Sequence, residues 1–408
     1  MFRVVLSKKK QVESPPLFVS LKLNFVHAVI FFKNLLLQSI ASFLFKKSKP
    51  DPKRIIVYKT GNIGDIACAV PALIAIRRAN PNAHICLITS PGERGRPGAA
   101  ELLKGVWYLD ELFVYHQEDI ASLKQKISFI RSLRARKTDL FIQLPEDLAG
   151  LRTLFRNIIL ARVVGARSAF GFVIRTIQLF KKAQVDYLQD ETEVESLLNM
   201  LGNYGIKTRK AEFDFNITEH ERKKVQDMLK KKQKNSNIII FSPGGKRPAN
   251  RWPVERFAEL AERLVKRYNA LIAIVGNDGE CCLAEEIAKK AGKTNTLVLT
   301  GKLTLRETIC LLEKTSLTVS NSTGTIHLSA ALGVPTVVID SVRNVPGRWF
   351  PYGEEHQVLY HKFLSCDYRE EICIKKSIET ITVDEVFEGC DNILSRHEDK
   401  KAQSGFYR

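Results

Sequence analysis

The sequence lacks the short motifs that identify several common enzyme classes. It has no G-x-x-x-x-G-K-[ST] phosphate loop, which argues against a P-loop nucleotide hydrolase. It also has no G-x-G-x-x-G fingerprint, which weakens the hypothesis of a nicotinamide-dependent dehydrogenase. Its 8 cysteines show no zinc-ligand spacing, so we expect free thiols in a reducing, cytosolic compartment. The charged stretch His220–Asn235 lacks the interleaved aromatics of nucleic-acid-binding motifs. The sequence therefore predicts neither a metal site nor a nucleic-acid partner.

Acidic residues are scarce, above all near the N-terminus. The chain has 63 Lys and Arg against 44 Asp and Glu, a formal net charge of +19. Residues 1–60 hold twelve Lys and Arg but two Asp and Glu, so 12 − 2 = +10 of that charge lies in this segment. A basic excess at one end indicates an anionic surface, either a membrane or a nucleic acid.

A long uninterrupted hydrophobic run and a cleavable signal pattern are also missing. The stretch Leu17–Phe45 is largely apolar but is broken by Lys22, His27 and Lys33, so no clean run reaches the roughly 18 residues of a spanning helix. We predict an amphipathic helix lying in the membrane interface, within a basic membrane-associating segment of residues 1–50. A helix packed on the protein's own core and a spanning helix stay open as alternatives. The polar residues that share one stripe of this helix are Ser20, Asn24, His27, Asn34, Gln38 and Ser42.

Beyond residue 51 the chain alternates apolar strands with helices, the pattern of a parallel α/β sheet. Since 408 residues are too many for one ordinary core, we predict two α/β domains, 51–215 and 216–395, followed by a polar tail, 396–408. The expected strands are Arg54–Lys59, His84–Thr89, Leu112–Tyr115, Asp139–Gln143 and Ala169–Phe172 in the first domain, and Ile238–Phe241, Leu271–Val275, Thr296–Leu299, Leu317–Ser320 and Pro335–Ile339 in the second.

Three unusual loops each follow an apolar strand and precede a helix. "KTGNIGD" (59–65) places a carboxylate at a helix start, where it fits either a helix cap or a catalytic base. "SPGGKRPANRWP" (242–253) offers glycines and cations, and "SNSTGTIH" (320–327) offers hydroxyls and backbone N–H groups. The last two suit a diphosphate. Because open α/β sheets gather such loops at one edge, we expect all three in a cleft between the domains.

In combination these segments resemble glycosyltransferase family 9, the ADP-heptose:lipopolysaccharide heptosyltransferases. The resemblance rests on "KTGNIGD…PALIAIRRANPNA", "SPGGK…NRWPVERFAELAERL" and "SNSTGTIHLSAALGVPTVV", with support from "LARVVGARSAFGF" (160–172) and "GRWFPYGEEHQVL" (347–359), and it spans roughly Arg54 to Leu394. It implies a GT-B fold, in which two Rossmann-like domains face a central cleft, here with an additional N-terminal amphipathic helical segment. It also implies metal-independent, inverting sugar transfer without a cofactor, from a nucleotide diphosphate-sugar to a lipid-linked saccharide at the cytoplasmic face of the inner membrane.

The resemblance also implies roles for individual residues. Asp65 matches the carboxylate proposed as general base, and Arg251 matches a basic residue that contacts the donor diphosphate. Either Asp278 or Glu280 would meet the ribose hydroxyls, and His327 would lie near the donor, with a histidine packed in its helix as an equal alternative. The expected donor-binding residues are Lys246, Arg251, Asp278, Glu280, Ser322, Thr323, Gly324, Thr325 and His327, and the expected acceptor-side loop comprises Thr60, Gly61, Asn62 and Gly64.

Two departures from the family pattern concern the donor. Ser322 stands where family members usually carry Asp, and "SVRNVPGR" (341–348) replaces a Gly-Pro-Thr run. Both bear on which donor sugar is used rather than on the catalytic step. We predict transfer of a sugar, with ADP-heptose as the implied donor, to a lipopolysaccharide core or related surface-glycan acceptor. The alternative is a catalytically silent relative that binds a nucleotide-sugar or scaffolds a membrane assembly.

Overall fold

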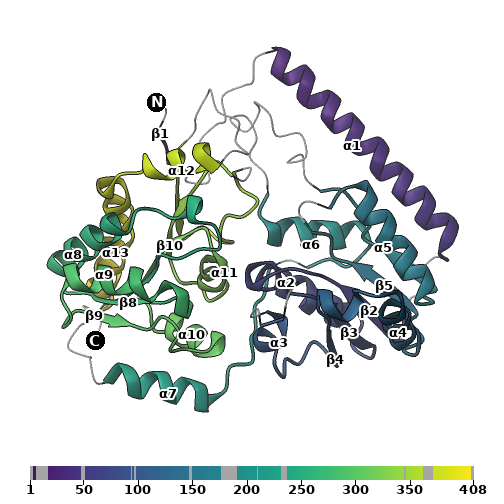
Figure 1. The fold of residues 1–408 in the computed structure, drawn as a ribbon, viewed down its shortest axis with the longest axis horizontal. Helices are drawn as coiled ribbons and strands as arrows, with labels where there is room; N and C mark the ends of the chain where they lie inside the picture. The colour runs from purple at the N-terminus through teal and green to yellow at the C-terminus, as the bar shows by residue number, and fades with distance from the viewer. Residues whose placement is uncertain are drawn as a thin grey trace. The chain divides into compact units, whose positions relative to one another are not determined.

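The chain folds into two compact units in a computed structural model (Figure 1), which describes residues 3–5, 17–46, 51–92, 94–95, 98–146, 149–175, 191–208, 210–230, 237–343, 346–361 and 371–405. We call Glu13–Tyr187 with Glu191–Asn216 the N-terminal unit. The C-terminal unit comprises Ile217–Arg408 with Met1–Val12 and Leu188–Asp190. Each unit has its own sheet, so the predicted α/β fold class with mainly parallel strands is confirmed.

The N-terminal unit is built on a five-stranded, fully parallel sheet with the order β4-β3-β2-β5-β6. Its central strand β2 leads into α2, which is buried from Ile66 to Arg77 and packs against α6. Its elements are α1 (Leu17–Leu44), β2 (Arg54–Tyr58), α2 (Ile63–Ala79), β3 (His84–Thr89), α3 (Ala99–Leu102), β4 (Glu111–Val114), η1 (Gln117–Ile120), α4 (Leu123–Arg134), β5 (Leu140–Gln143), α5 (Leu151–Val163), β6 (Ser168–Phe170) and α6 (Glu193–Asn203).

The C-terminal unit has a seven-stranded sheet with the order β1-β12-β11-β10-β7-β8-β9, parallel except for β1. Strands β7, β10 and β11 are neighbours, so the loops that leave them share one sheet edge. The elements are β1 (Arg3–Val5), α7 (Glu219–Lys230), β7 (Ile238–Ser242), η4 (Pro248–Asn250), α8 (Val254–Tyr268), β8 (Leu271–Ile274), η5 (Asp278–Glu280), α9 (Cys281–Ala291), β9 (Thr296–Val298), α10 (Leu305–Leu312), β10 (Leu317–Asn321), α11 (Gly324–Ala331), β11 (Thr336–Asp340), β12 (His356–His361), α12 (Glu371–Glu379) and α13 (Val383–Gly405).

Helix α8 illustrates how the pattern of apolar residues builds these units. Its buried residues Phe257, Leu260, Ala261, Leu264 and Tyr268 recur at spacings of one, three and four residues and form one face. That face packs into the same core as the apolar strands of the sheet. The opposite face is rich in Glu, Lys and Arg and stays in solvent.

Helix α1 agrees in part with the alternative of a helix packed on the protein's own core. Its last turns pack on the N-terminal unit, because Leu37 is fully buried and Phe45, just beyond the helix, joins the same core. The Asn34 side chain fixes the helix further by donating to the Ile174 carbonyl at 3.0 Å and accepting from the Ile174 N–H at 2.7 Å. Yet Phe31 is 64% exposed and Phe43 is 90% exposed. The helix therefore packs along one stripe and presents apolar side chains outward along another.

Three features differ from the sequence-based expectations. Strands β1 and β12 were not predicted, and β1 joins the C-terminal unit although it precedes α1. Cys373 is disulfide-bonded, so the expectation of free thiols is wrong for this residue, whereas Cys68, Cys86, Cys281, Cys282, Cys310 and Cys390 are free. Helix α13 continues to Gly405, through most of the range predicted as a polar tail, whose last residues, 406–408, lie outside the described residues.

Candidate active site

Asp65 lies at the carboxyl edge of the N-terminal sheet, in the first turn of α2. Its Oδ2 accepts a hydrogen bond from the Asn62 backbone N–H at 2.9 Å, which makes it part of a capping box at the helix start. The side chain is half-buried. A carboxylate has two oxygens with several acceptor positions, so this capping contact leaves capacity for a second partner. Capping and proton transfer are compatible roles for the same group.

The surroundings of Asp65 raise its affinity for a proton. Burial raises the pKa of the Asp65 carboxyl above its usual value, and the negative charges of Glu193 and Glu146 raise it further, whereas the positive charge of Lys59 and the Asn62 hydrogen bond lower it. A carboxylate with a raised pKa is a better base near neutral pH than an ordinary, solvated one.

A buried ion network explains why Lys59 does not neutralise Asp65 outright. Lys59 is fully buried, and its Nζ donates to Glu193 Oε1 at 3.0 Å and to the Pro145 carbonyl at 3.3 Å. Arg175 donates to Glu193 Oε2 at 2.9 Å, so one buried carboxylate holds two cations. The charge of Lys59 is thus shared between Glu193, which it contacts, and Asp65, which it affects at longer range.

The acceptor-side loop is shaped around Asp65. Gly61 has φ +140°, and a Cβ atom at this position would lie 2.4 Å from the Asp65 Cβ, so only glycine fits. Thr60 donates its hydroxyl proton to Glu146, which follows the neighbouring strand β5. Of the remaining loop residues, Asn62 is exposed and Gly64 is half-buried in the first turn of α2. Glu146 was not predicted as a site residue. Its position after a strand that pairs with β2 is the signal that could have identified it.

In the C-terminal unit, Asn321 ties together two of the predicted donor loops. Its Nδ2 donates to the carbonyls of Pro243 at 2.6 Å and Gly244 at 3.1 Å, and its Oδ1 accepts from the Trp252 N–H at 3.1 Å. The end of β10 is thereby fixed to both ends of the loop that follows β7. Asn321 was also missed, because its role is to position backbone rather than to contact a ligand.

These contacts bring Arg251 and the start of α11 together. Arg251 donates from Nε and Nη2 to the Gly245 carbonyl at 2.9 and 2.6 Å. A Cβ on Gly245 would lie 3.7 Å from the Thr323 Cγ2 and 3.8 Å from the Arg251 Cγ. Thr323 is the N-cap of α11, so Gly245 lies close to the residue at which this helix begins. A helix N-terminus next to a guanidinium is suited to an anion.

The other predicted donor residues lie around this point with different exposure. Lys246 and Asp278 are exposed, while Ser322, Gly324 and Thr325 are half-buried, and Thr325 Oγ1 lies 3.2 Å from Ser242 Oγ. His327 lies on the buried face of α11, with its ring 5.8 Å from that of Trp349 in an edge-to-face contact. This position agrees with the alternative of a packed helix histidine.

The structure distinguishes the two acidic candidates of the β8 loop. Glu280 is buried, and its carboxylate accepts from the N–H groups of Gly245 at 2.9 Å and Asn277 at 3.0 Å. A Cβ at Gly244 would lie 1.9 Å from Glu280 Oε1, so this glycine is required. Glu280 therefore adjoins the β7 loop, whereas Asp278 lies against Gly301, where a Cβ would come within 1.5 Å of its Oδ1.

One further cation near this edge was missed by the sequence reasoning. Burial and the nearby positive charge of Arg247 lower the pKa of Arg343, while Asp340 raises it. Arg343 follows β11, the neighbour of β10, and Arg247 follows β7. Two guanidinium groups close enough to repel one another indicate a place where an additional anion would be stabilised. Among the described residues there is no group of three or more His, Cys, Asp and Glu side chains placed to hold a metal ion.

Comparisons with known proteins find similar sequences. The sequence model of "Glycosyltransferase family 9 (heptosyltransferase)" matches residues 126–377. Lipopolysaccharide core heptosyltransferase OpsX of Haemophilus influenzae is 20% identical over 314 residues, 76% of this chain and 84% of that protein. Lipooligosaccharide heptosyltransferase 2 of the same organism is 32% identical over 106 residues, 25% of this chain and only 30% of that protein.

Solved structures share the fold. A glycosyltransferase family 9 protein from Veillonella parvula has a TM-score of 0.69 at 22% identity, covering 86% of this chain and 100% of its own. E. coli ADP-heptose lps heptosyltransferase II has a TM-score of 0.60 at 18% identity, covering 85% and 99%. E. coli heptosyltransferase WaaC with ADP has a TM-score of 0.58 at 18% identity, covering 83% and 99%. The predicted GT-B class of fold is confirmed.

Proposed function

The chain belongs to glycosyltransferase family 9, whose sequence model matches more than half of it, and from this premise we propose that it transfers heptose from ADP-heptose to a lipopolysaccharide core or related surface-glycan acceptor. The observation that carries the proposal is that the match runs from residue 126 in the N-terminal unit to residue 377 in the C-terminal unit. The donor and the acceptor class follow the names of relatives, among them a lipopolysaccharide core heptosyltransferase and a structure with ADP-2-deoxy-2-fluoro heptose.

In the proposed reaction Asp65 acts as general base. The acceptor hydroxyl oxygen attacks the anomeric carbon of the donor while the bond from that carbon to the diphosphate oxygen breaks, which inverts the anomeric configuration. The hydroxyl proton passes to the Asp65 carboxylate, and the raised pKa of this group supports the assignment. The capping contact with Asn62 holds the carboxylate in one orientation.

The leaving diphosphate needs stabilisation of its negative charge. We assign this task to Arg251 and to the backbone N–H groups at the start of α11, residues Thr323 to Thr325. The exposed Lys246 adds positive charge at the same loop. Glu280 remains our candidate for the ribose hydroxyls, because it is the acidic residue that adjoins the β7 loop.

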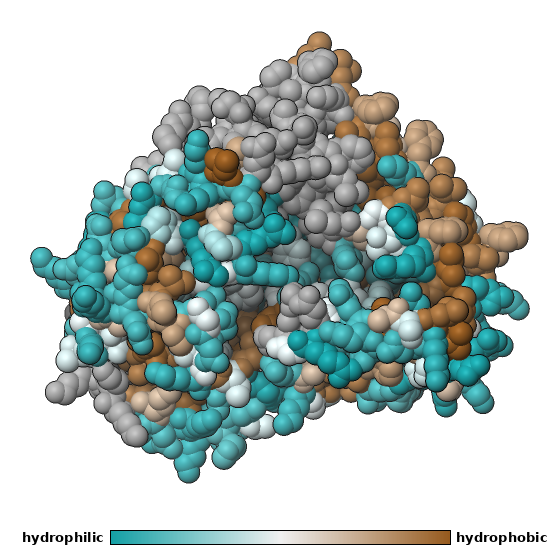
Figure 2. All heavy atoms as spheres, viewed as in Figure 1, coloured by the Kyte–Doolittle hydropathy of each residue, from teal (hydrophilic) through white to brown (hydrophobic). Residues whose placement is uncertain are grey.

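We also propose that α1 and α5 hold the enzyme at the cytoplasmic face of the inner membrane as an interfacial anchor. Figure 2 shows hydrophobic residues (brown) gathered along α1. A 21-residue stretch of this helix, Asn24–Leu44, is long and apolar enough to cross a membrane by length and composition, and 11% of it is buried. The large apolar side chains exposed on α1 are Leu17, Leu21, Phe25, Phe31, Phe32, Leu35, Leu36 and Phe43.

Helix α5 extends this apolar surface. It contacts α1, and its exposed residues Phe155, Ile159 and Val163 are four residues apart, which places them on one face. The same helix carries Arg152 and Arg156, which suit anionic headgroups. Because α1 and α5 belong to one unit and share a core, we favour a helix lying in the interface over a helix that crosses the bilayer.

The anchor can be tested without removing α1, whose deletion would take Leu37 and Phe45 from the core. We expect the double substitution Phe31→Ser and Phe32→Ser to reduce flotation with phosphatidylglycerol-containing vesicles and to leave the melting temperature nearly unchanged. Part of the wild-type binding should disappear at high salt, where surface charges are screened. Leu123→Ser on α4, 74% exposed, is the matched control and should float normally. Unchanged flotation of the double variant would refute the anchor.

The reaction is tested directly by incubating the full chain with ADP-heptose and a heptose-accepting core oligosaccharide, delipidated or embedded in vesicles. We expect ADP release and a product heavier by one heptose. A panel of other nucleotide-sugars tests the donor, because Ser322 stands where the resemblance leads one to expect Asp. Tight ADP-heptose binding without any transfer to either acceptor would favour the catalytically silent alternative.

A further inference from the structure

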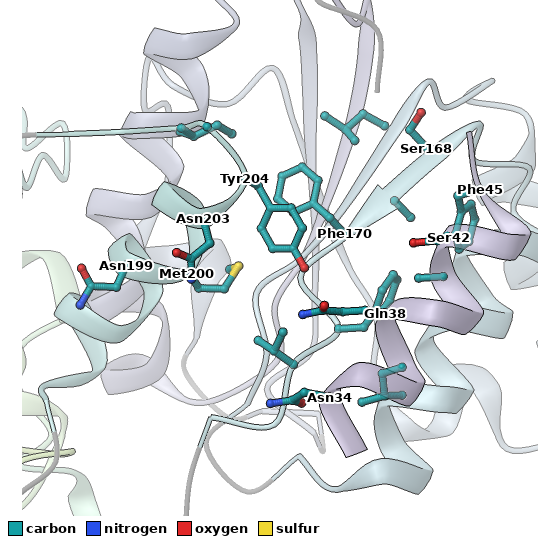
Figure 3. Close-up of a pocket in the computed structure, with 18 of the residues that line it drawn as sticks. Asn34, Gln38, Ser42, Phe45, Ser168, Phe170, Asn199, Met200, Asn203 and Tyr204 are labelled. Carbon is teal, nitrogen blue, oxygen red and sulfur yellow. The ribbon is translucent and has the colours of Figure 1, made fainter. Parts of the chain in front are cut away.

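A pocket of about 1060 Å³ lies within the N-terminal unit, between α1, α6 and the edge strand β6 (Figure 3). One end of it lies far from Asp65, whereas Arg175, which also lines it, binds the Glu193 carboxylate of the network near Asp65. Asp65 lies in the first turn of α2 and Asn80, which lines the pocket, follows the last turn, so about 15 residues and roughly 22 Å of helix lie between them. Its size is at the upper end of the roughly 300–1,000 Å³ of small-molecule sites.

The lining combines apolar side chains with uncharged hydrogen-bonding groups. It includes Gln38 and Ser42 from α1, Ser168 from β6, and Asn199, Asn203 and Tyr204 from the end of α6. Amide and hydroxyl side chains both donate and accept hydrogen bonds, as the hydroxyl groups of a sugar do. Three charged residues also line the pocket: Arg175 is engaged by Glu193 and the Pro145 carbonyl, Glu191 accepts from Asn199, and Lys46 is exposed. The uncharged amide and hydroxyl groups favour a neutral polyhydroxylated ligand.

An aromatic platform accompanies these polar groups. The rings of Phe170 and Tyr204 are stacked, with centroids 4.3 Å apart and planes inclined by 18°. Tyr204 remains 37% exposed, and Figure 3 shows the Gln38 side chain on the facing helix projecting toward it. The face of an aromatic ring carries partial negative charge and attracts the C–H groups on one face of a sugar ring.

The pocket walls are held in place by the fold. Gly171, next to Phe170, has φ +92°, and a Cβ there would lie 2.0 Å from the Gln143 carbonyl oxygen, so the strand can leave the sheet in this way only with glycine. The opposite wall is fixed by Leu37 and by the two hydrogen bonds between Asn34 and Ile174. A fixed wall lowers the entropic cost of ordering side chains around a ligand.

Helix α1 contributes both to the pocket and to the apolar surface that we propose faces the membrane. Its polar residues Gln38 and Ser42 line the pocket, while Phe43 and Leu36 point to solvent from another side of the same helix. We propose that the pocket is a second saccharide subsite, which binds sugar residues of the membrane-borne acceptor at a distance from Asp65. The identity of that glycan rests on the proposed function, whereas binding of sugar to the pocket does not require catalysis.

The test is calorimetric titration of the full chain with delipidated core oligosaccharide, in the absence of donor. We expect the wild type to bind, and we expect Gln38→Leu and Tyr204→Ala each to weaken binding by about tenfold or more, since each loses contacts to the sugar. ADP affinity should not change in either variant. Ser39→Leu is the matched control, because Ser39 is exposed on α1 but does not line the pocket, and its oligosaccharide affinity should equal that of the wild type.

The possible outcomes separate this inference from the proposed function. The subsite is overturned if the wild type does not bind oligosaccharide, or if both pocket variants bind it as tightly as the wild type, even if transfer occurs. Oligosaccharide binding that depends on Gln38 and Tyr204 supports it even if no transfer is detected. If the two variants instead weaken ADP-heptose and leave the oligosaccharide unaffected, the pocket serves the donor sugar, and the assignment to the acceptor is wrong.

Discussion

The loop after β2 and the loops after β7 and β10 use charge in opposite ways. Near Asp65 the cations are buried and already paired, with Lys59 and Arg175 both bound to Glu193. The carboxylate that remains has a raised pKa. Around Arg251 the buried group is acidic, because Glu280 is 7% exposed and its carboxylate accepts from two backbone N–H groups. The start of α11 and the exposed Lys246 supply positive charge at this place.

This difference indicates a division of labour. A group that must take a proton benefits from a pKa close to the working pH, which burial and paired cations provide. A group of donors that must hold a diphosphate benefits from unneutralised positive charge and preorganised N–H groups. Substitutions in the two regions should therefore have separable effects, on the rate of transfer in one and on nucleotide affinity in the other.

Asp65→Asn should give the largest difference between the effect on the rate of transfer and the effect on nucleotide affinity. Loss of a general base typically lowers the rate by about 10²–10⁴-fold, and we expect kcat to fall within this range while calorimetric ADP affinity stays unchanged. The Asn side chain can still accept from the Asn62 N–H, so the helix cap should survive. A variant that retains more than about a tenth of the wild-type kcat would show that Asp65 is only a cap.

A matched control for this variant exists in the same unit. Glu195 holds the equivalent position in the capping box of α6, where its Oε2 accepts from the Thr192 N–H at 2.9 Å. Glu195→Gln removes one carboxylate charge from a helix start without touching the candidate site. Its kcat should remain close to that of the wild type, and a comparable loss would mean that capping alone accounts for the effect.

The next effect in size should come from Arg251→Ala on the donor side. A hydrogen bond to a charged group contributes about 1.5–3 kcal/mol, so ADP and ADP-heptose should both bind about 10- to 150-fold more weakly. Arg256→Ala is the control, since this guanidinium donates to the backbone carbonyls of Glu379 and Ile381. Nucleotide affinity that does not respond to Arg251→Ala would remove this residue from the donor site.

The sequence was sufficient to predict most of the frame of this site. Strand β3 has the predicted bounds, and β7 and β10 extend only one residue past theirs, because alternating apolar strands and turn residues define these elements locally. The positions of Asp65 and of Thr323 at helix starts also follow from local pattern. Strand β1 was missed, since a three-residue strand that pairs across almost the whole chain leaves no local signal, and the six-residue β12 was missed as well.

The electrostatic details of the site could not be predicted in the same way. The bond between Lys59 and Glu193 joins residues 134 positions apart, so nothing in either neighbourhood reveals it. Likewise, the choice between Asp278 and Glu280 depends on which carboxylate turns toward Gly245, and both lie in the same short turn. Tertiary contacts decide these features, whereas pattern decides where a strand ends.

The smallest effect tests the origin of the Asp65 pKa itself. The negative charge of Glu146 is one of the influences that raise this pKa, although burial is the largest. Glu146→Gln removes that charge and keeps an oxygen that can accept from Thr60, so the pKa of Asp65 should fall. Because the base must be deprotonated, activity is lost as pH decreases through its pKa, and the acid limb of the kcat/KM profile should move to lower pH.

The stability of the fold should not decrease together with the activity as the pH falls. A carboxyl whose pKa is higher in the folded than in the unfolded chain binds its proton more tightly when folded, so Asp65 makes the fold more stable, not less, as pH falls through its raised pKa. A melting temperature that does not drop with the rate would therefore separate titration of the base from unfolding.

Glu118→Gln, which removes the same charge from an exposed position, should leave the profile unchanged. An acid limb that stays in place or moves to higher pH in Glu146→Gln would show that this carboxylate does not act on Asp65.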